Sequence, residues 1–330
     1  MKILYLAPKR GTAAHRGKAM QRLGHELHWI DPYDTISKDR LTSKYIRWTG
    51  GVGLWSYVGR QIFKQIHQTY DVVFINGGSL LGPKVVQQLK AISHKVVCYN
   101  NDDPFGGRDI QTWLALQKSI PFYNLLVFPR LVNVEEAKRV GATKAIRAWF
   151  TADEIEHAYT EGQQRSKIVF VGTWFPGRDL FMQELLKDNV PLEIFGNSWE
   201  HAPLWPSIKN NHFGAGIEGQ NYRNTLGGGT VCLGLLSKEN RDLHTTRSIE
   251  IPAMGGLLLA ERTQEHLELF KDGEEAVFWD SPQECAEKSK WLLEHPETAR
   301  HIALAGHCKV KKLGLYNENF ITQILTEAFL

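Results

Sequence analysis

The chain has 330 residues, of which 42% are hydrophobic and 23% charged, a composition that excludes a disordered protein and suits two domains of roughly 150 residues each. Its formal net charge of +3 is small and the charges are interspersed, so nucleic-acid binding through a basic stripe is not indicated. The four cysteines form no Cys-x-x-Cys pair, which argues against a zinc knuckle and a secreted disulfide scaffold. No apolar run reaches the ~20 residues of a membrane span, and the start is too short in its apolar run for a signal peptide. We therefore expect a cytoplasmic chain, free or peripheral at the inner membrane face.

The first half alternates apolar strands with helices. In chain order, we predict strands at Lys2–Ala7, His25–Ile30, Asp71–Ile75, Lys95–Tyr99, Asn124–Phe128 and Ala145–Trp149, with helices ending near Gly24, at Pro83–Ala91 and near Val134–Val140. Strands rich in Val, Ile, Leu and Phe that alternate with helices are typical of a parallel sheet covered on both faces.

The segment Lys38–Tyr70 is less regular and mixes Lys and Arg with Trp and Tyr. It predicts an amphipathic helix pair packed on the first domain. The alternatives are an acceptor-binding surface or a patch that touches a membrane interface.

The same pattern restarts after a polar segment, Glu156–Ser166, that is typical of a linker. We predict strands at Lys167–Val171, Leu192–Phe195, Val231–Leu235, Leu257–Ala260 and Ala276–Trp279, and helices at Leu180–Lys187, Asn221–Leu226, Thr246–Met254, Glu265–Phe270, Pro282–Glu294 and Tyr316–Leu330. Domain boundaries follow at 1–157, 158–166 for the linker, 167–312 and 313–330 for a final helix. Two such α/β halves predict a ligand at the carboxyl ends of the strands, in a cleft between the two domains.

The stretch Asn240–Gly256 joins a predicted strand to a predicted helix. Thr245 or Thr246 is a good N-cap, so the free N–H groups of a helix N-terminus should lie there and can hold a diphosphate without metal. Glu250 follows about one turn later, where a carboxylate can accept hydrogen bonds from both ribose hydroxyls. The alternative is an ordinary strand–helix connection in which Glu250 is solvated or ion-paired.

Loops after other predicted strands add candidates. Phe195–Ser198 and the glycine-rich Phe213–Gly219 lie where a nucleobase could be read, with backbone groups near Ile217 facing a uracil edge. No Gly-Lys-Ser/Thr occurs, so a Walker-type ATPase is not indicated. In the first half, Asn101-Asp102-Asp103-Pro104 ends a strand, and a carboxylate there could act as base on an acceptor hydroxyl. The alternative is a simple turn, because Asp before Pro is a turn former.

A family resemblance covers much of the second half. Phe170-Val171-Gly172-Thr173 with Arg178, the run Arg247–Gly256, and its continuation through Leu257–Arg262, Leu269–Glu275 and Phe278-Trp279 resemble the sugar-nucleotide domain of GT-B glycosyltransferases. Within that set they are most similar to the spore-maturation (CgeB-like) group among the retaining enzymes. The resemblance implies a GT-B fold, with two Rossmann-like domains facing each other across a cleft and a last helix that crosses back to the first domain.

The resemblance also implies roles for individual residues. Retaining enzymes carry two glutamates eight positions apart, the second of which binds the donor ribose; here these positions are Asp242 and Glu250. His244, Thr245 and Thr246 would offer amides or hydroxyls to the diphosphate, and Arg178 would neutralise the leaving phosphate. The predicted donor site is Gly172, Thr173, Arg178, Asn197, Ile217, Tyr222, His244, Thr245, Thr246 and Glu250, with Arg178 and Asp103 as candidate catalytic residues.

The predicted function is a hexosyltransferase that moves a sugar from a nucleoside-diphosphate donor, UDP-linked in our reading, without metal or cofactor. Retention of configuration is favoured over inversion, but the Asp at position 242 in place of the first family glutamate leaves both open. Paired aspartates such as Asp102-Asp103 bind metal in the other glycosyltransferase fold, but there they lie beside the donor. The acceptor could be a glycan, lipid, protein or metabolite. Alternatives are a catalytically silent sugar-nucleotide-binding protein and a sugar-nucleotide epimerase. A dehydrogenase is disfavoured, since neither half shows Gly-x-Gly-x-x-Gly after its first strand.

Overall fold

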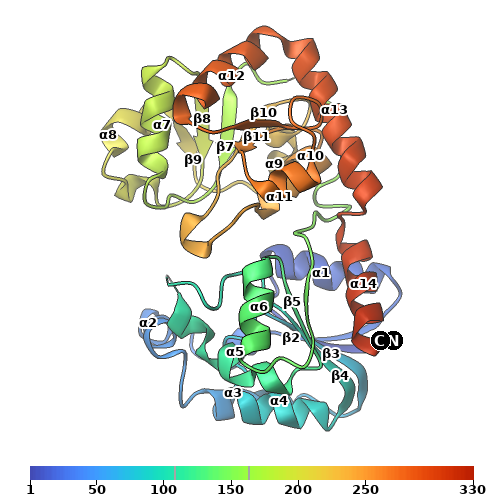
Figure 1. Ribbon diagram of the computed structural model, residues 1–330. Helices are drawn as coiled ribbons and strands as arrows, with labels where there is room; N and C mark the ends of the chain where they lie inside the picture. The colour runs from blue at the N-terminus through green and yellow to red at the C-terminus, as the bar shows by residue number, and fades with distance from the viewer. Residues whose placement is uncertain (108, 163) are drawn as a thin grey trace. The chain divides into compact units, whose positions relative to one another are not determined.

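The computed structural model describes residues 1–107, 109–162 and 164–330, which form two compact units (Figure 1). Unit 1 comprises Met1–Phe150, Lys238–Arg241 and Asn317–Leu330, and unit 2 comprises Thr151–Ser237 and Asp242–Tyr316. Gln163, in the predicted linker, lies outside the described residues.

Unit 1 is built on a parallel sheet with the strand order β2-β1-β3-β4-β5-β6 among the residues described. Its elements are β1 Lys2–Leu6, α1 Gly11–Arg22, β2 Glu26–Ile30, α2 Arg40–Thr49, α3 Trp55–Phe63, β3 Tyr70–Asn76, α4 Pro83–Lys90, β4 Ser93–Tyr99, α5 Leu114–Ser119, β5 Leu125–Phe128, α6 Leu131–Arg139, β6 Ala145–Arg147 and α14 Asn317–Phe329. The predicted helix pair at Lys38–Tyr70 is present as α2 and α3.

Both faces of this sheet are buried. Leu4 and Leu6 of β1 pack into one hydrophobic cluster, and Ile3 and Tyr5 pack into another on the opposite face. Alternation between two apolar clusters explains why the strands are continuous apolar runs in the sequence. The C-terminal helix α14 belongs to unit 1, where it packs beside α1 (Figure 1) and places Phe320 against the ring of Tyr99, with ring centroids 4.9 Å apart.

Unit 2 repeats the architecture with the strand order β12-β11-β10-β7-β8-β9, and its strands are also parallel. Its elements are β7 Ile168–Val171, α7 Arg178–Lys187, β8 Leu192–Phe195, α8 Trp205–Ile208, β9 His212–Gly214, α9 Gly219–Leu226, β10 Val231–Gly234, α10 Thr246–Ala253, β11 Leu257–Glu261, α11 Gln264–Leu269, β12 Val277–Trp279, α12 Pro282–Glu294 and α13 Pro296–Leu313. The predicted pair of doubly covered parallel sheets is therefore confirmed.

Besides the short helices α5 and α8, which were not predicted, the sequence-based assignment was wrong at three places. The helix α13 was not predicted, because its buried face consists mostly of small residues, among them Ala299, Ala303 and Gly306, which give no apolar stripe. Phe213 and Gly214, predicted to start a loop, belong to the edge strand β9. Arg178, which lies before the helix predicted at Leu180–Lys187, is the first residue of α7.

The strand order places one topological switch point in each sheet. In unit 2 the chain proceeds from β7 outward to β8 and β9, then returns to the other side of β7 to form β10. Loops that leave neighbouring strands in opposite directions open a crevice at their carboxyl ends, where α/β proteins bind ligands. In unit 1 the corresponding point lies between β1 and β3.

Candidate functional site

The N-terminus of α10 is fixed by a directional chain of hydrogen bonds. The ring of His266 faces the Glu261 carbonyl through Nδ1 at 2.7 Å, so Nδ1 carries the proton and Nε2 accepts. Ser248 Oγ therefore donates to His266 Nε2 at 2.8 Å and accepts from the Thr245 amide at 3.0 Å. Thr245 is the N-cap residue, as one of the two predicted alternatives had it.

The histidine at the end of this chain is held neutral by its surroundings. His266 is fully buried on α11 and stacks on Phe278, with ring centroids 5.3 Å apart and planes at 10°. Burial lowers the pKa of His266 to about 4, with the charge of His244 acting in the same direction. His244 itself is buried, and its Nδ1 lies 2.5 Å from Glu265 Oε2. The side chain of His244, one of the predicted phosphate ligands, is therefore paired with Glu265 of α11.

Glu250 lies within α10, and its carboxylate is 2% exposed. Its Oε2 accepts from the Tyr222 hydroxyl at 2.7 Å and from Arg247 Nη1 at 2.5 Å. Its Oε1 lies 3.6 Å from His157 Nε2. Burial alone would raise the pKa of Glu250, but the interactions with Arg247 and His157 and the Tyr222 hydrogen bond outweigh it and lower that pKa. The carboxylate is therefore ionised at neutral pH.

Two arginines meet the carboxyl ends of the strands at the unit 2 switch point. Arg247 Nε donates to the Val171 carbonyl at the end of β7, at 3.2 Å. Arg178 Nη1 donates to the Thr173 carbonyl at 2.7 Å, and its Nη2 to the Leu235 carbonyl, just after β10, at 3.4 Å. Since β7 and β10 are neighbours, both guanidinium groups serve the same edge of the sheet.

Gly172 is required by the packing between these groups. A Cβ at this position would lie 2.7 Å from the ring of Phe170 and 3.4 Å from Arg178 Nη1. Arg178 also lies over the Phe170 ring, 5.4 Å from its centroid. A side chain at position 172 would therefore push both the ring and the cation from their places.

The structure brings most of the predicted donor-site residues to this edge of unit 2. Tyr222 and Glu250 touch directly, while Gly172, Thr173 and Arg178 follow β7. The loop after β8 joins them, because Asn197 accepts from the Trp174 amide through its carbonyl (2.9 Å) and from the Gly216 amide through its side chain (3.2 Å). Ile217, beside Gly216, is half-buried and Asn197 is exposed.

Sequence reasoning missed two residues of this arrangement. Arg247 was noted only within the family run, although a cation in the first turn of a helix opposes the helix dipole and so signals an expected anion. His157 gave no signal. It comes from the segment before β7, and its Nδ1 accepts from the Asp153 amide at 2.9 Å, which leaves Nε2–H to face Glu250.

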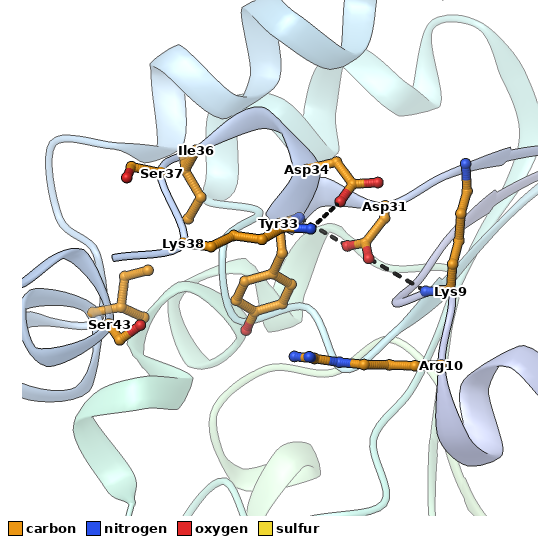
Figure 2. A pocket seen from close by; sticks show the side chains of 10 residues that line it. Lys9, Arg10, Asp31, Tyr33, Asp34, Ile36, Ser37, Lys38 and Ser43 are labelled. Atoms are coloured by element: carbon orange, nitrogen blue, oxygen red, sulfur yellow. Dashed lines mark hydrogen bonds and ion pairs between the residues drawn. The ribbon is translucent and has the colours of Figure 1, made fainter. Parts of the chain in front are cut away.

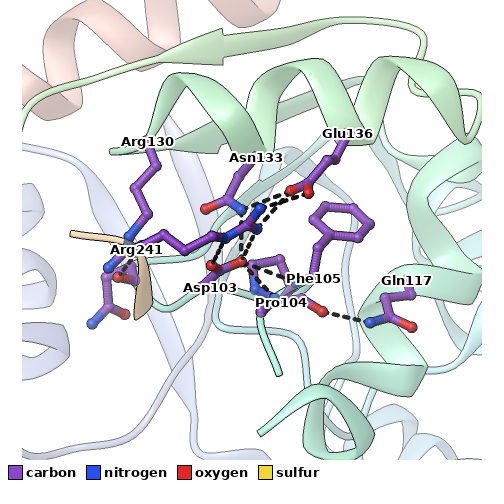
Figure 3. A network of polar contacts seen from close by, with 10 residues as sticks. Asp103, Pro104, Phe105, Gln117, Arg130, Asn133, Glu136 and Arg241 are labelled. Atoms are coloured by element: carbon purple, nitrogen blue, oxygen red, sulfur yellow. Dashed lines mark hydrogen bonds and ion pairs between the residues drawn. The ribbon is translucent and has the colours of Figure 1, made fainter. Parts of the chain in front are cut away.

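Asp103, the other predicted catalytic residue, lies in a separate network within unit 1 (Figure 3). Arg241 Nε donates to its Oδ2 at 2.6 Å and Nη2 to its Oδ1 at 2.7 Å, while Asn133 Nδ2 donates to Oδ1 at 2.7 Å. Arg241 also bonds both oxygens of Glu136, at 2.8 and 2.9 Å. The Asp103 side chain is 0% exposed.

The charges of this network fix its ionisation. Burial by itself would raise the pKa of Asp103, but the hydrogen bonds from Arg241 and Asn133 lower it overall. The carboxylate is thus an ionised anchor for Arg241, and its predicted action as a base on the acceptor stays a prediction.

The described residues contain neither a cluster of metal-ligating side chains nor a helix that could span a membrane. Among residues 1–107, 109–162 and 164–330, no group of three or more His, Cys, Asp or Glu side chains is placed to share a metal ion. No helix in the described part of the chain combines the length and apolar character needed to cross a bilayer.

Known proteins share this architecture. The structure superposes over 100% of its length on 99% of sucrose-phosphate synthase from Thermosynechococcus elongatus, with a TM-score of 0.67 and 11% sequence identity. HepE of Anabaena, solved with UDP and glucose, matches 99% of this chain over 100% of its own, with a TM-score of 0.66 and 13% identity. A glycosyltransferase from Rickettsia africae gives a TM-score of 0.60 at 11% identity, covering 99% and 97% of the two chains.

The fold is that of the GT-B glycosyltransferases. Residues 178–326 also match a family model described as glycosyl transferase-like. That stretch begins at Arg178 and includes Arg247 and Glu250. None of the curated proteins matches the chain by sequence.

Proposed function

We propose that this GT-B chain transfers a sugar from a UDP-sugar to a hydroxyl-bearing acceptor. One observation carries the proposal: Arg178, Arg247 and the N-terminus of α10 meet at the switch point of unit 2, with the ionised Glu250 one turn further along the helix. Two cations and free backbone amides suit a diphosphate, and a nearby carboxylate suits ribose hydroxyls. The UDP seen with HepE, and the glycosyl transferase-like match, support this donor class.

In this scheme different residues bind different parts of the donor. The Thr246 amide and the two guanidinium groups bind the diphosphate, and Arg178 stabilises the charge that develops as UDP leaves. The Asn197 and Ile217 loops cover the base. Arg247 shares Glu250 Oε2 with Tyr222, so a bound diphosphate draws the guanidinium toward the phosphates and frees the carboxylate for the ribose.

We propose the finer assignments on the family resemblance. They are a hexosyl donor, retention of configuration, catalysis without metal or cofactor, membership of the spore-maturation (CgeB-like) group, and a cytoplasmic location. The exposed aromatic side chains of α2, Tyr45 and Trp48, make peripheral contact with the inner membrane face part of this proposal.

Calorimetry with UDP, GDP, ADP, dTDP and NAD, in the presence of EDTA, tests the donor site. We expect UDP to bind, and Glu250→Gln to weaken it about ten- to a hundredfold because one charge-assisted ribose contact is lost. Glu193→Gln is the control: Glu193 is a half-buried glutamate of unit 2 that is also paired with an arginine, Arg165, at 2.5 Å. Thermal unfolding of each variant shows that it folds.

Equal binding of UDP by Glu250→Gln and wild type would refute the ribose assignment, and no binding of any diphosphate would refute the donor site. A second measurement separates the activities. Sugar appearing on an added acceptor supports transfer, isomerised sugar nucleotide indicates an epimerase, and tight UDP-sugar binding without turnover across an acceptor panel indicates a silent binder.

A further inference from the structure

Unit 1 contains a cavity that the donor site does not use. It has a volume of about 480 Å³ and lies where the chain leaves β1 and β2. Its lining combines cations, hydroxyls and an apolar part: Lys9, Arg10, Asp31, Tyr33, Asp34, Ile36, Ser37, Lys38, Ser43 and Ile46 (Figure 2). This volume is in the range of pockets that hold small metabolites.

Both carboxylates of the cavity already have partners. Asp34 is paired with Lys38 at 2.6 Å. Asp31 accepts the amide of Tyr33 at 2.9 Å and the amide of Lys9 at 3.3 Å, and so caps the short 3-10 helix Pro32–Thr35. The Asp31 carboxylate is therefore bonded to backbone amides, and the Lys38 ammonium is paired with Asp34.

The two remaining cations have no such partner. Within the described residues, the side chains of Lys9 and Arg10 make no hydrogen bond or ion pair. Figure 2 shows the Arg10 side chain extending toward the hydroxyl end of Tyr33.

Tyr33 gives the cavity a fixed wall. Its hydroxyl lies 2.5 Å from Ser79 Oγ, and Ser79 is a buried residue of the loop that follows β3. The wall is thus tied to the switch point between β1 and β3, where an α/β sheet presents its ligand site. Arg10 directly precedes α1, whose first turn contains no acidic residue to compete for an anion.

We propose that this cavity binds the acceptor, and that the acceptor carries an anionic group, a phosphate or a carboxylate, held by Arg10. The ligand's role as acceptor rests on the proposed function, whereas anion binding by the cavity is tested independently of it. Ser37, Ser43 and the Tyr33 hydroxyl are the polar groups available to the uncharged part of the ligand.

A matched set of three small ligands tests the proposal on the full chain: glycerol 3-phosphate, glycerate and glycerol, titrated by NMR with the donor site saturated by UDP. We expect one of the two anions to bind and glycerol not to bind. The difference between the anions identifies the group. Arg10→Gln should weaken that binding about tenfold or more, because a charge-assisted contact is lost. Arg60→Gln, which removes an exposed cation of α3 outside the cavity, should leave it unchanged.

Binding of glycerol as tightly as the anions, binding of none of the three, or equal binding by Arg10→Gln would overturn the proposal. A further result would also overturn the proposal: the anion competes with UDP, and this competition is lost in Arg247→Gln but not in Arg10→Gln. That result would place the anion in the donor site. If UDP itself does not bind, the donor proposal fails, and the same titration without UDP still tests the cavity.

Discussion

Acidification should destabilise the protein through His266, the neutral end of the hydrogen-bond chain that holds the start of α10. The perturbation is the substitution His266→Gln, which keeps an uncharged acceptor for Ser248 but cannot take up a proton. Burial lowers the pKa of His266 in the folded protein from its ordinary 6.5 to about 4. A histidine with a lowered folded pKa binds its proton more tightly in the unfolded chain, so folding stability falls as the pH drops from 6.5 toward 4.

The size of the effect follows from these values. One pKa unit corresponds to about 1.4 kcal/mol, so the fall from 6.5 to about 4 is worth about 3 kcal/mol once the pH reaches 4. At pH 5 the unfolded histidine is almost fully protonated and the folded one is largely neutral, and about 2 kcal/mol is lost relative to pH 8.

The assay is urea unfolding at pH 8 and at pH 5 for wild type, His266→Gln and His201→Gln. His201 is the matched control because its side chain is 72% exposed. We expect wild type and His201→Gln to lose about 2 kcal/mol more between the two pH values than His266→Gln loses. Comparing the change in unfolding free energy between the two pH values cancels the stability that His266→Gln loses at every pH because its stacking on Phe278 is missing. Equal losses in wild type and His266→Gln would refute the buried, neutral state of this histidine.

Two further outcomes follow from the same contacts. Arg178→Gln should lower kcat for sugar transfer about a hundredfold with a smaller change in KM, since its charge acts mainly on departing UDP; a change in KM alone, measured by UDP release, would contradict that role. In Asp103→Asn the free energy of unfolding should fall less on acidification than in wild type. The reason is that a carboxylate whose pKa is lowered in the folded state stabilises the fold above its unfolded pKa, and this contribution is lost as the pH falls through the folded pKa. Urea unfolding at pH 7 and pH 3 checks this, with Asp34→Asn, an exposed carboxylate of the same unit, as control.

The local pattern of the sequence was sufficient to predict the architecture of the two sheets. The apolar runs of β1 and β7 and the helices between strands predicted two doubly covered parallel sheets, because burial of both faces of a strand leaves a continuous apolar run. Thr245 marked the start of α10, since N-capping depends on residues within one turn. The position of Glu250 one turn into that helix followed from the same register.

Tertiary structure alone decided what these residues touch. Glu250 is bonded by Tyr222 of α9 and faced by His157 from the segment before β7, and Asp103 is bound by Arg241, 138 positions away along the chain. The cavity of unit 1 likewise depends on a distant contact, because the Tyr33 hydroxyl meets Ser79, 46 positions away along the chain. Helix and strand periodicity specify which face a side chain occupies, but its partner comes from whichever distant element packs there. That choice is made by the folded core, and no spacing within one segment of the sequence contains it.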